Sequence, residues 1–247
     1  MKTLKINLSI ITILVVFLFL AGTMSSCGTK SQKEAEEQTE ESDHHEQDSS
    51  DTEDHNEVGH HDEGTAESTS ETMMWMPGDQ PFTGMLKLAQ GNEASLAPSV
   101  TSESDGSKIL NLTLSGEKVI LLFDGALENV GANLQFKTNS FQGEVAVVHH
   151  YTDASNYDYV SLTSSAMKLG RVENGKDNVM DNKEMKMPTD WATLTVSSAG
   201  EHYKGILNEK LINHGHGETR AAGQVGVLLS GKGKVMLKMM EVMKLTE

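Results

Sequence analysis

The feature that most constrains the fold is a succession of short apolar runs in residues 75–247, separated by glycine, asparagine, aspartate and serine. Apolar and polar residues alternate within several runs, so that residues such as Leu134 and Phe136 share one face of an extended strand. None of the runs has the 3.6-residue spacing of an amphipathic helix. Regularly spaced strands with turn residues between them are typical of an antiparallel β-sandwich.

The predicted strands are residues 109–114, 118–123, 132–137, 144–151, 157–163, 167–172, 191–197, 202–207, 224–229 and 235–245. Glycine-containing turns are predicted at residues 115–116, 124–125, 174–175 and 231–233, where a positive φ is needed. In the last run the apolar parity changes, which predicts a β-bulge near Met239 or Met240.

Residues 1–26 have the pattern of an export signal. Lys2 and Lys5 precede an apolar run over residues 8–21, which is shorter than the ~20 residues of a membrane-spanning helix. The stretch Met24-Ser25-Ser26-Cys27 resembles the lipobox of bacterial lipoproteins. The resemblance implies acylation of Cys27 and attachment to a membrane surface through the lipid alone. The alternative is an ordinary cleaved signal followed by an unmodified thiol.

Residues 27–74 form a strongly acidic segment, with two lysines against 16 carboxylates and a net charge of −14. Between residues 31 and 72 the one sizeable apolar side chain is Val58, so the segment is predicted to be a disordered tether. Its start, Gln32-Lys33-Glu34 and then Glu36-Glu37, resembles the acidic signal that sends some lipoproteins of the Bacteroidetes to the outer face of the outer membrane. Surface display and retention on the periplasmic face both stay open.

The tether also contains five histidines among its carboxylates, and these residue types suit Zn²⁺, Ni²⁺ or Cu²⁺. The candidate metal ligands here are His44, His45, His55, His60 and His61. The alternative is a solvated low-complexity spacer with no metal role.

The composition excludes other classes of protein. A net charge of −16, with no Lys- or Arg-rich segment, argues against binding to nucleic acid. The single cysteine excludes a disulfide framework and a cysteine-rich zinc site. Nothing in the sequence requires a cofactor or indicates an oligomeric state.

Residues 132–245 resemble the concanavalin-A-like jelly-roll superfamily, in particular laminin-G-like and 3-keto-disaccharide-hydrolase-like domains. The resemblance runs through ANLQFK, GEVAVVHHYTDASNYDYVSLT, MKLGRVENGK, WATLTVSSAGEHYKGILNEKL and AGQVGVLLSGKGKVMLKMMEV. It implies one jelly-roll β-sandwich over residues 75–247, behind the disordered tether.

The resemblance also bears on function. The glucanase branch of the superfamily carries a Glu-x-Asp-x-x-Glu strand, and residues 75–247 contain no such run. Asp153, Asp158 and Glu173 are predicted at turns or on the solvent face. We therefore expect a non-catalytic module that binds carbohydrate. The alternatives are a divergent glycoside or 3-keto-disaccharide hydrolase and a metal-capturing lipoprotein.

Sugars stack on aromatic rings, and polar residues beside those rings supply hydrogen bonds. The predicted ligand-binding residues are Tyr151, Asp153, Asn156 and Tyr157.

Histidines in the body of the chain give two further candidates. His149 and His150 are adjacent in a strand, so their side chains are expected on opposite faces, unable to bind one ion together. His214 and His216 are two residues apart in an extended loop and share a side, which makes them candidate metal ligands. A flexible polar turn is the alternative for this pair.

Overall fold

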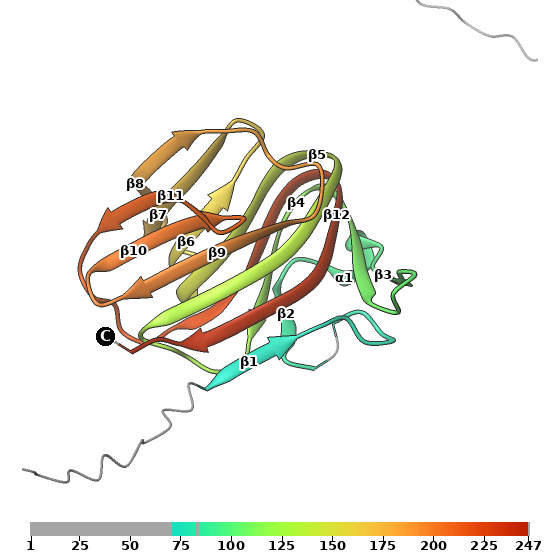
Figure 1. Cartoon of the computed structure of the whole chain (residues 1–247), viewed down its shortest axis with the longest axis horizontal. Helices are drawn as coiled ribbons and strands as arrows, with labels where there is room; N and C mark the ends of the chain where they lie inside the picture. Colours follow the sequence, from blue (N-terminus) through green and yellow to red (C-terminus); the bar gives the residue numbers. More distant parts are fainter. Residues whose placement is uncertain (1–70, 83, 247) are drawn as a thin grey trace, which may run out of the picture. The chain divides into compact units, whose positions relative to one another are not determined.

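The computed structural model describes residues 71–82 and 84–246, and almost all regular structure in them is antiparallel β-sheet (Figure 1). The strands are β1 (Thr72–Trp75), β2 (Leu86–Gln90), β3 (Ser99–Ser102), β4 (Lys108–Phe123), β5 (Val130–Asp153), β6 (Asn156–Leu162), β7 (Ala166–Glu173), β8 (Lys176–Glu184), β9 (Ala192–Ala199), β10 (His202–Leu207), β11 (Lys210–His216) and β12 (Gln224–Lys244). A helix of four residues, α1 (Glu93–Leu96), follows β2. Within these residues no helix has the length and apolarity to span a membrane. The predicted signal, Cys27 and the histidines of the tether lie outside the described residues.

The strands form two packed layers because the longest strands take part in both. The N-terminal half of β5 pairs with β9, and its C-terminal half pairs with β6. β12 follows β5 along its length, and Figure 1 shows the two strands arching together from one layer into the other. The first layer contains β11, β10, β9 and the adjoining halves of β5, β12 and β4, with β1 and β3 at its margin. The second layer contains β8, β7, β6 and the other halves of the three long strands, with β2 beyond β4. The prediction of an antiparallel jelly-roll β-sandwich is confirmed.

Two predicted turns are wrong, because residues 115–116 and 231–233 lie inside β4 and β12. The glycines here permit a bend within a strand. Gly231 has a φ of 138°, and a Cβ atom on it would lie 2.4 Å from the carbonyl oxygen of Gln142 on β5. Glycine is therefore required where the backbones of β5 and β12 approach each other at the bend.

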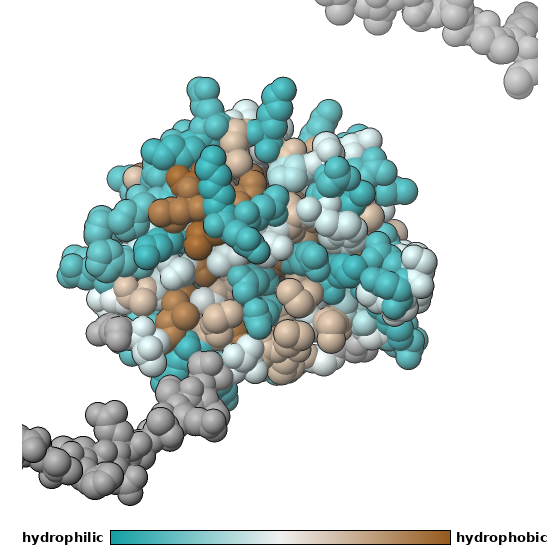
Figure 2. All heavy atoms as spheres, viewed as in Figure 1, coloured by the Kyte–Doolittle hydropathy of each residue, from teal (hydrophilic) through white to brown (hydrophobic). Residues whose placement is uncertain are grey.

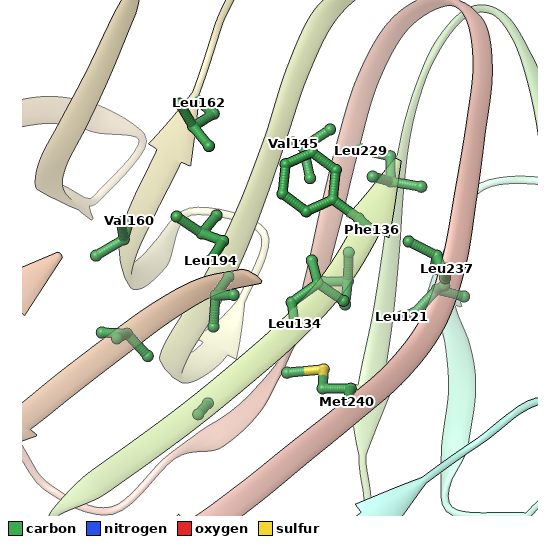
Figure 3. Close-up of a cluster of buried hydrophobic side chains, with 14 of the residues drawn as sticks. Leu121, Leu134, Phe136, Val145, Val160, Leu162, Leu194, Leu229, Leu237 and Met240 are labelled. Carbon is green, nitrogen blue, oxygen red and sulfur yellow. The ribbon is translucent and has the colours of Figure 1, made fainter. Parts of the chain in front are cut away.

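The larger core lies between the two layers and is built from the inward-facing residues of both (Figure 3). Leu134 and Phe136 are fully buried in it, as their alternation predicts. A second, smaller cluster lies on the other side of the second layer, which we call its outer face. Its buried members are Ile120, Leu122, Ala146, Val148, Tyr157, Tyr159 and Leu228.

Two strands that matter for the site are absent from the sequence prediction. β8 has the sequence KDNVMDNKE and is mostly exposed, and β11 is the segment expected as an extended loop. Each stands at an end of the strand order and pairs through hydrogen bonds with one named strand, β7 or β10. Such edge strands need no apolar alternation to be stable in a sheet. The predicted bulge is found between Leu237 and Met239 in β12.

Candidate functional site

A cavity of about 400 Å³ opens on the outer face of the second layer. We call it the outer-face cavity. Neighbouring strands supply its walls because their alternate residues point away from the main core. The side chains that carry its chemistry are Lys118 of β4, Glu144 of β5, Tyr157 and Tyr159 of β6, Lys168 of β7 and Asp177 of β8.

Hydrogen bonds hold the tyrosines of the cavity in place. The Tyr159 hydroxyl donates to Oδ1 of Asp177 at 2.6 Å, and Nζ of Lys118 donates to the Tyr157 hydroxyl at 2.9 Å. Burial, together with the hydrogen bond to Asp177, raises the pKa of Tyr159. Both tyrosines are only 6% exposed. They therefore form a floor below the charged groups, and their ring faces are largely covered.

The four predicted ligand-binding residues lie at the β5–β6 turn, and of the four only Tyr157 lines the cavity. The rings of Tyr151 and Tyr157 stack with centroids 6.0 Å apart. Asp153 accepts hydrogen bonds from Nδ2 of Asn156 at 3.0 Å and from the Ser155 amide at 2.7 Å. These bonds, first that from Asn156, lower the pKa of Asp153.

Asn156 in turn accepts a hydrogen bond from the Asn174 amide at 2.9 Å, which ties the β5–β6 turn to the β7–β8 turn. The polar atoms of Asp153 and Asn156 thus make hydrogen bonds that stabilise the β5–β6 turn. Their contact with a ligand stays a prediction.

The expectation for His149 and His150 is wrong. The two rings lie on one side, with their Nδ1 atoms 3.0 Å apart. The reason is a bulge in β5 after His149, where His150 has a φ of +48°, so strict alternation fails at this step. Asp158 is also misplaced by the prediction, since it is 1% exposed and faces into the sandwich beside His150.

These residues belong to a buried polar cluster, which we define as His149, His150, Asp158, Arg171 and Tyr203. The Arg171 guanidinium donates to both carboxylate oxygens of Asp158, at 2.7 and 3.1 Å. His150 approaches the same carboxylate at 3.2 Å through Nδ1 and donates through Nε2 to the Glu128 carbonyl at 2.8 Å.

The cluster continues through Tyr203. Arg171 donates to the Tyr203 hydroxyl at 3.1 Å, and this hydroxyl donates to the Glu218 carbonyl at 2.6 Å. The buried polar cluster therefore joins β5, β6, β7 and β10 with two loops.

Charge in the cluster is balanced by partners. Burial by itself raises the pKa of Asp158, but hydrogen bonds from His150 and Arg171 outweigh it and hold that pKa below its usual range. Burial, together with a smaller contribution from the neighbouring His150, lowers the pKa of His149 to about 3. His149, His150 and Asp158 offer ligand atoms within 4.8 Å of one another. Because Arg171 engages both oxygens of Asp158, the arrangement favours a structural role over cation binding.

His214 and His216 are the predicted metal ligands within the described residues. Both are exposed on β11, a regular strand and not a flexible turn. The structure brings His202 of β10 beside them, so that three imidazoles offer ligand atoms within 4.8 Å of one another. Sequence reasoning missed His202, which is 12 residues from His214, because only the β10–β11 pairing places them together.

No protein-family model matches the chain, and no curated protein matches its sequence. Solved structures do match. A protein of unknown function, SO2946 from Shewanella oneidensis, has a TM-score of 0.54 at 10% identity, over 70% of this chain and 86% of its own. A Bacillus licheniformis β-glucanase has a TM-score of 0.50 at 11% identity, over 72% of this chain and all of its own. The carbohydrate-binding module CBM66 from Bacillus subtilis has a TM-score of 0.49 at 14% identity, over 62% of this chain and 94% of its own. The first two matches define the class of the described domain as an all-β jelly roll.

Proposed function

We propose that this protein binds a neutral oligosaccharide in the outer-face cavity. The observation that carries the proposal is the cavity itself, about 400 Å³ with an apolar floor and polar groups converging from five strands. A volume of about 400 Å³ is within the range of ligand pockets, and the lining is more polar than that of most such pockets, which suits a ligand rich in hydroxyl groups. The fold is shared with a protein named as a β-glucanase, so such a scaffold accommodates carbohydrate chemistry.

The charges of the cavity support a neutral ligand. Lys118 and Lys168 stand against Glu144 and Asp177, so the lining has no excess of either sign. Ammonium and carboxylate groups together donate to and accept from hydroxyl groups, which carry both functions. A polyol satisfies such a lining better than an anion does. Since the rings of Tyr157 and Tyr159 are largely covered, we expect hydrogen bonds to contribute more than stacking.

A glycoside hydrolase is the second candidate, because Glu144 and Asp177 are two carboxylates on one cavity. Hydrolysis needs a carboxylic acid and a carboxylate on either side of the glycosidic bond. These two residues come from different strands, β5 and β8, unlike the single-strand motif of the glucanase branch.

We further propose attachment to the bacterial envelope through acylated Cys27, with the domain at the outer membrane. The support is the apolar run followed by the lipobox-like stretch. We expect Cys27→Ser to release the full chain from the membrane fraction. If the variant stayed with the membranes after signal cleavage, the lipid anchor would be excluded.

The binding proposal is tested with the full chain on a panel of neutral and acidic oligosaccharides, with binding and product release measured separately. We expect retention of a neutral glycan, and a loss of about tenfold or more in affinity for Asp177→Asn and Lys118→Met, since each removes a charged hydrogen-bonding group. Asp190→Asn and Lys210→Met are matched controls at exposed positions outside the cavity.

Retention without product supports a binding module, and product release supports the hydrolase. Affinity that survives both cavity substitutions, or no retention of any glycan, contradicts the assignment to this cavity.

A further inference from the structure

Three histidines converge on the solvent face of the β10–β11 hairpin, and none of them lines the outer-face cavity. His202 and His216 are cross-strand partners, and His214 lies two residues before His216 on the same strand. The centroids of the His202 and His216 rings are 4.6 Å apart, and those of His214 and His216 are 4.7 Å apart. We call these three residues the histidine trio.

The spacing suits a single metal ion. Tetrahedral Zn²⁺ with Zn–N bonds of 2.0–2.1 Å needs nitrogens ~3.3 Å apart. The ligand atoms of the trio already lie within 4.8 Å of one another. Because all three side chains are exposed, rotation about their χ angles brings the nitrogens to that separation without a change in the backbone.

The backbone beneath the trio is fixed. β10 is hydrogen-bonded to β9 on one side and to β11 on the other. The His214 amide donates to Oδ2 of Asp181 on β8 at 3.2 Å, which secures β11 from its other side. Gly215 points inward, where a Cβ atom would lie 3.0 Å from Leu169. In this strand Gly215 therefore faces the core, and His214 and His216 on either side of it face solvent.

The surroundings contain charges of both signs. Lys204 is the cross-strand partner of His214, and Lys204, Glu201 and His202 line a cavity of about 610 Å³ beside the trio. The ammonium group of Lys204 opposes a bound cation and the Glu201 carboxylate favours it. The open side of the trio leaves room for water in the remaining coordination positions.

We propose that His202, His214 and His216 bind one divalent transition-metal ion, Zn²⁺ or Cu²⁺, through three imidazole nitrogens. Imidazole selects these ions over Mg²⁺ and Ca²⁺, which prefer oxygen ligands. Three protein ligands with open positions can bind the ion exchangeably or present it to a further ligand. The site is independent of the carbohydrate proposal, since the two share no residue.

The test uses the full chain, with the histidines of the acidic tether replaced so that they do not contribute. The background variant carries glutamine at His44, His45, His55, His60 and His61. Calorimetric titration with ZnCl₂ is expected to show one Zn²⁺ per chain at micromolar or tighter affinity. His202→Gln, His214→Gln and His216→Gln are each expected to weaken it about tenfold or more, because two imidazoles make a much poorer site.

Two further substitutions make the test specific. Lys210→Gln changes an exposed charge on the same hairpin and is expected to leave the affinity unchanged. Lys204→Gln is expected to tighten binding a few-fold, since it removes a like charge beside the ion. X-ray absorption of the Zn²⁺ complex is expected to show three imidazole ligands.

The proposal fails if the background variant takes up no Zn²⁺ or if His214→Gln leaves the affinity unchanged. It also fails if millimolar Mg²⁺ displaces the Zn²⁺, since that would indicate carboxylate ligands.

Discussion

The buried polar cluster and the histidine trio both contain histidines, and they lie on opposite faces of β10. Tyr203 of β10 points inward to Arg171, while the neighbouring His202 points out to His214 and His216. In the buried cluster, His150 contacts the Asp158 carboxylate and the Glu128 carbonyl, and the Tyr203 hydroxyl contacts the Arg171 guanidinium. The rings of the trio contact one another in solvent. Burial favours pairing of polar atoms, and in this cluster Nε2 of His149 is the ring nitrogen left without a hydrogen-bond partner. The exposed imidazoles of the trio lie together with nitrogen lone pairs open to a ligand from solvent.

The largest effect that this comparison predicts is on stability. Arg171→Met leaves the buried Asp158 carboxylate without its bidentate partner. We expect the free energy of unfolding at pH 7 to fall by about 3–5 kcal/mol, as for other broken buried pairs. Chemical denaturation measures it. Lys210→Met, which removes an exposed cation, is the control. A loss below about 1 kcal/mol would mean that the buried polar cluster is not a structural unit.

Zinc should stabilise the protein through the trio alone. In the variant with the five tether histidines replaced, Zn²⁺ at 100 times its Kd is expected to add about 2.7 kcal/mol to the free energy of unfolding. Thermal or chemical denaturation with and without Zn²⁺ measures the gain. At the same Zn²⁺ concentration, the background with His214→Gln should lose about half of this gain or more, because its affinity is expected to be about tenfold weaker or worse. An equal gain in both proteins would place the stabilising ion elsewhere and break the comparison.

Lowering the pH below 6.5 should reduce the stability of the fold through His149 of the buried polar cluster. The pKa of His149 is about 3 in the folded protein, whereas an unfolded chain takes up this proton near pH 6.5. Between these values the unfolded state binds more protons, so stability falls as the pH falls, by at most about 1.4 kcal/mol per pH unit from this group. Denaturation at several pH values from 6.5 to 4.5 measures the slope. His149→Gln is expected to make it shallower.

Measuring between pH 6.5 and 4.5 separates the effect of His149 on stability from that of Asp158. The lowered pKa of Asp158 stabilises the fold above the ordinary carboxyl pKa of ~3.9, and that contribution is lost only at lower pH. A slope between pH 6.5 and 4.5 that does not change in His149→Gln would show that the ring is not kept neutral by burial.

Alternation along the chain was sufficient to predict the interior strands. Leu134 and Phe136 lie in the core as predicted, because a strand with one buried face has apolar residues at every second position. The edge strand β8 shows little alternation of apolar and polar residues, since most of its residues are exposed. The glycines of β4 and β12 predict turns because glycine is common both at turns and at bends within strands. The sequence alone does not show that the backbone of β5 approaches Gly231.

The sites depended on cross-strand register, which a single sequence does not reveal. The pair His214 and His216 follows from local spacing, but His202 joins it only through the β10–β11 pairing, which shifts register between Gly205 and Ile206. Lys118 reaches Tyr157 from a strand that is 39 residues away. His150 lies on the same side as His149, against the prediction, because a positive φ at a bulge changes the direction of its side chain.

The smallest predicted effect concerns the trio without metal. Replacing His202, His214 and His216 together by glutamine removes exposed side chains that contact mainly one another, so no buried polar group loses its partner. We expect the free energy of unfolding, measured in the presence of a chelator, to change by no more than about 0.5 kcal/mol, as for other surface substitutions. The same protein should gain nothing from Zn²⁺. A metal-free loss above about 1 kcal/mol would give the trio a structural role like that of the buried polar cluster, and the contrast between the two faces of β10 would then fail.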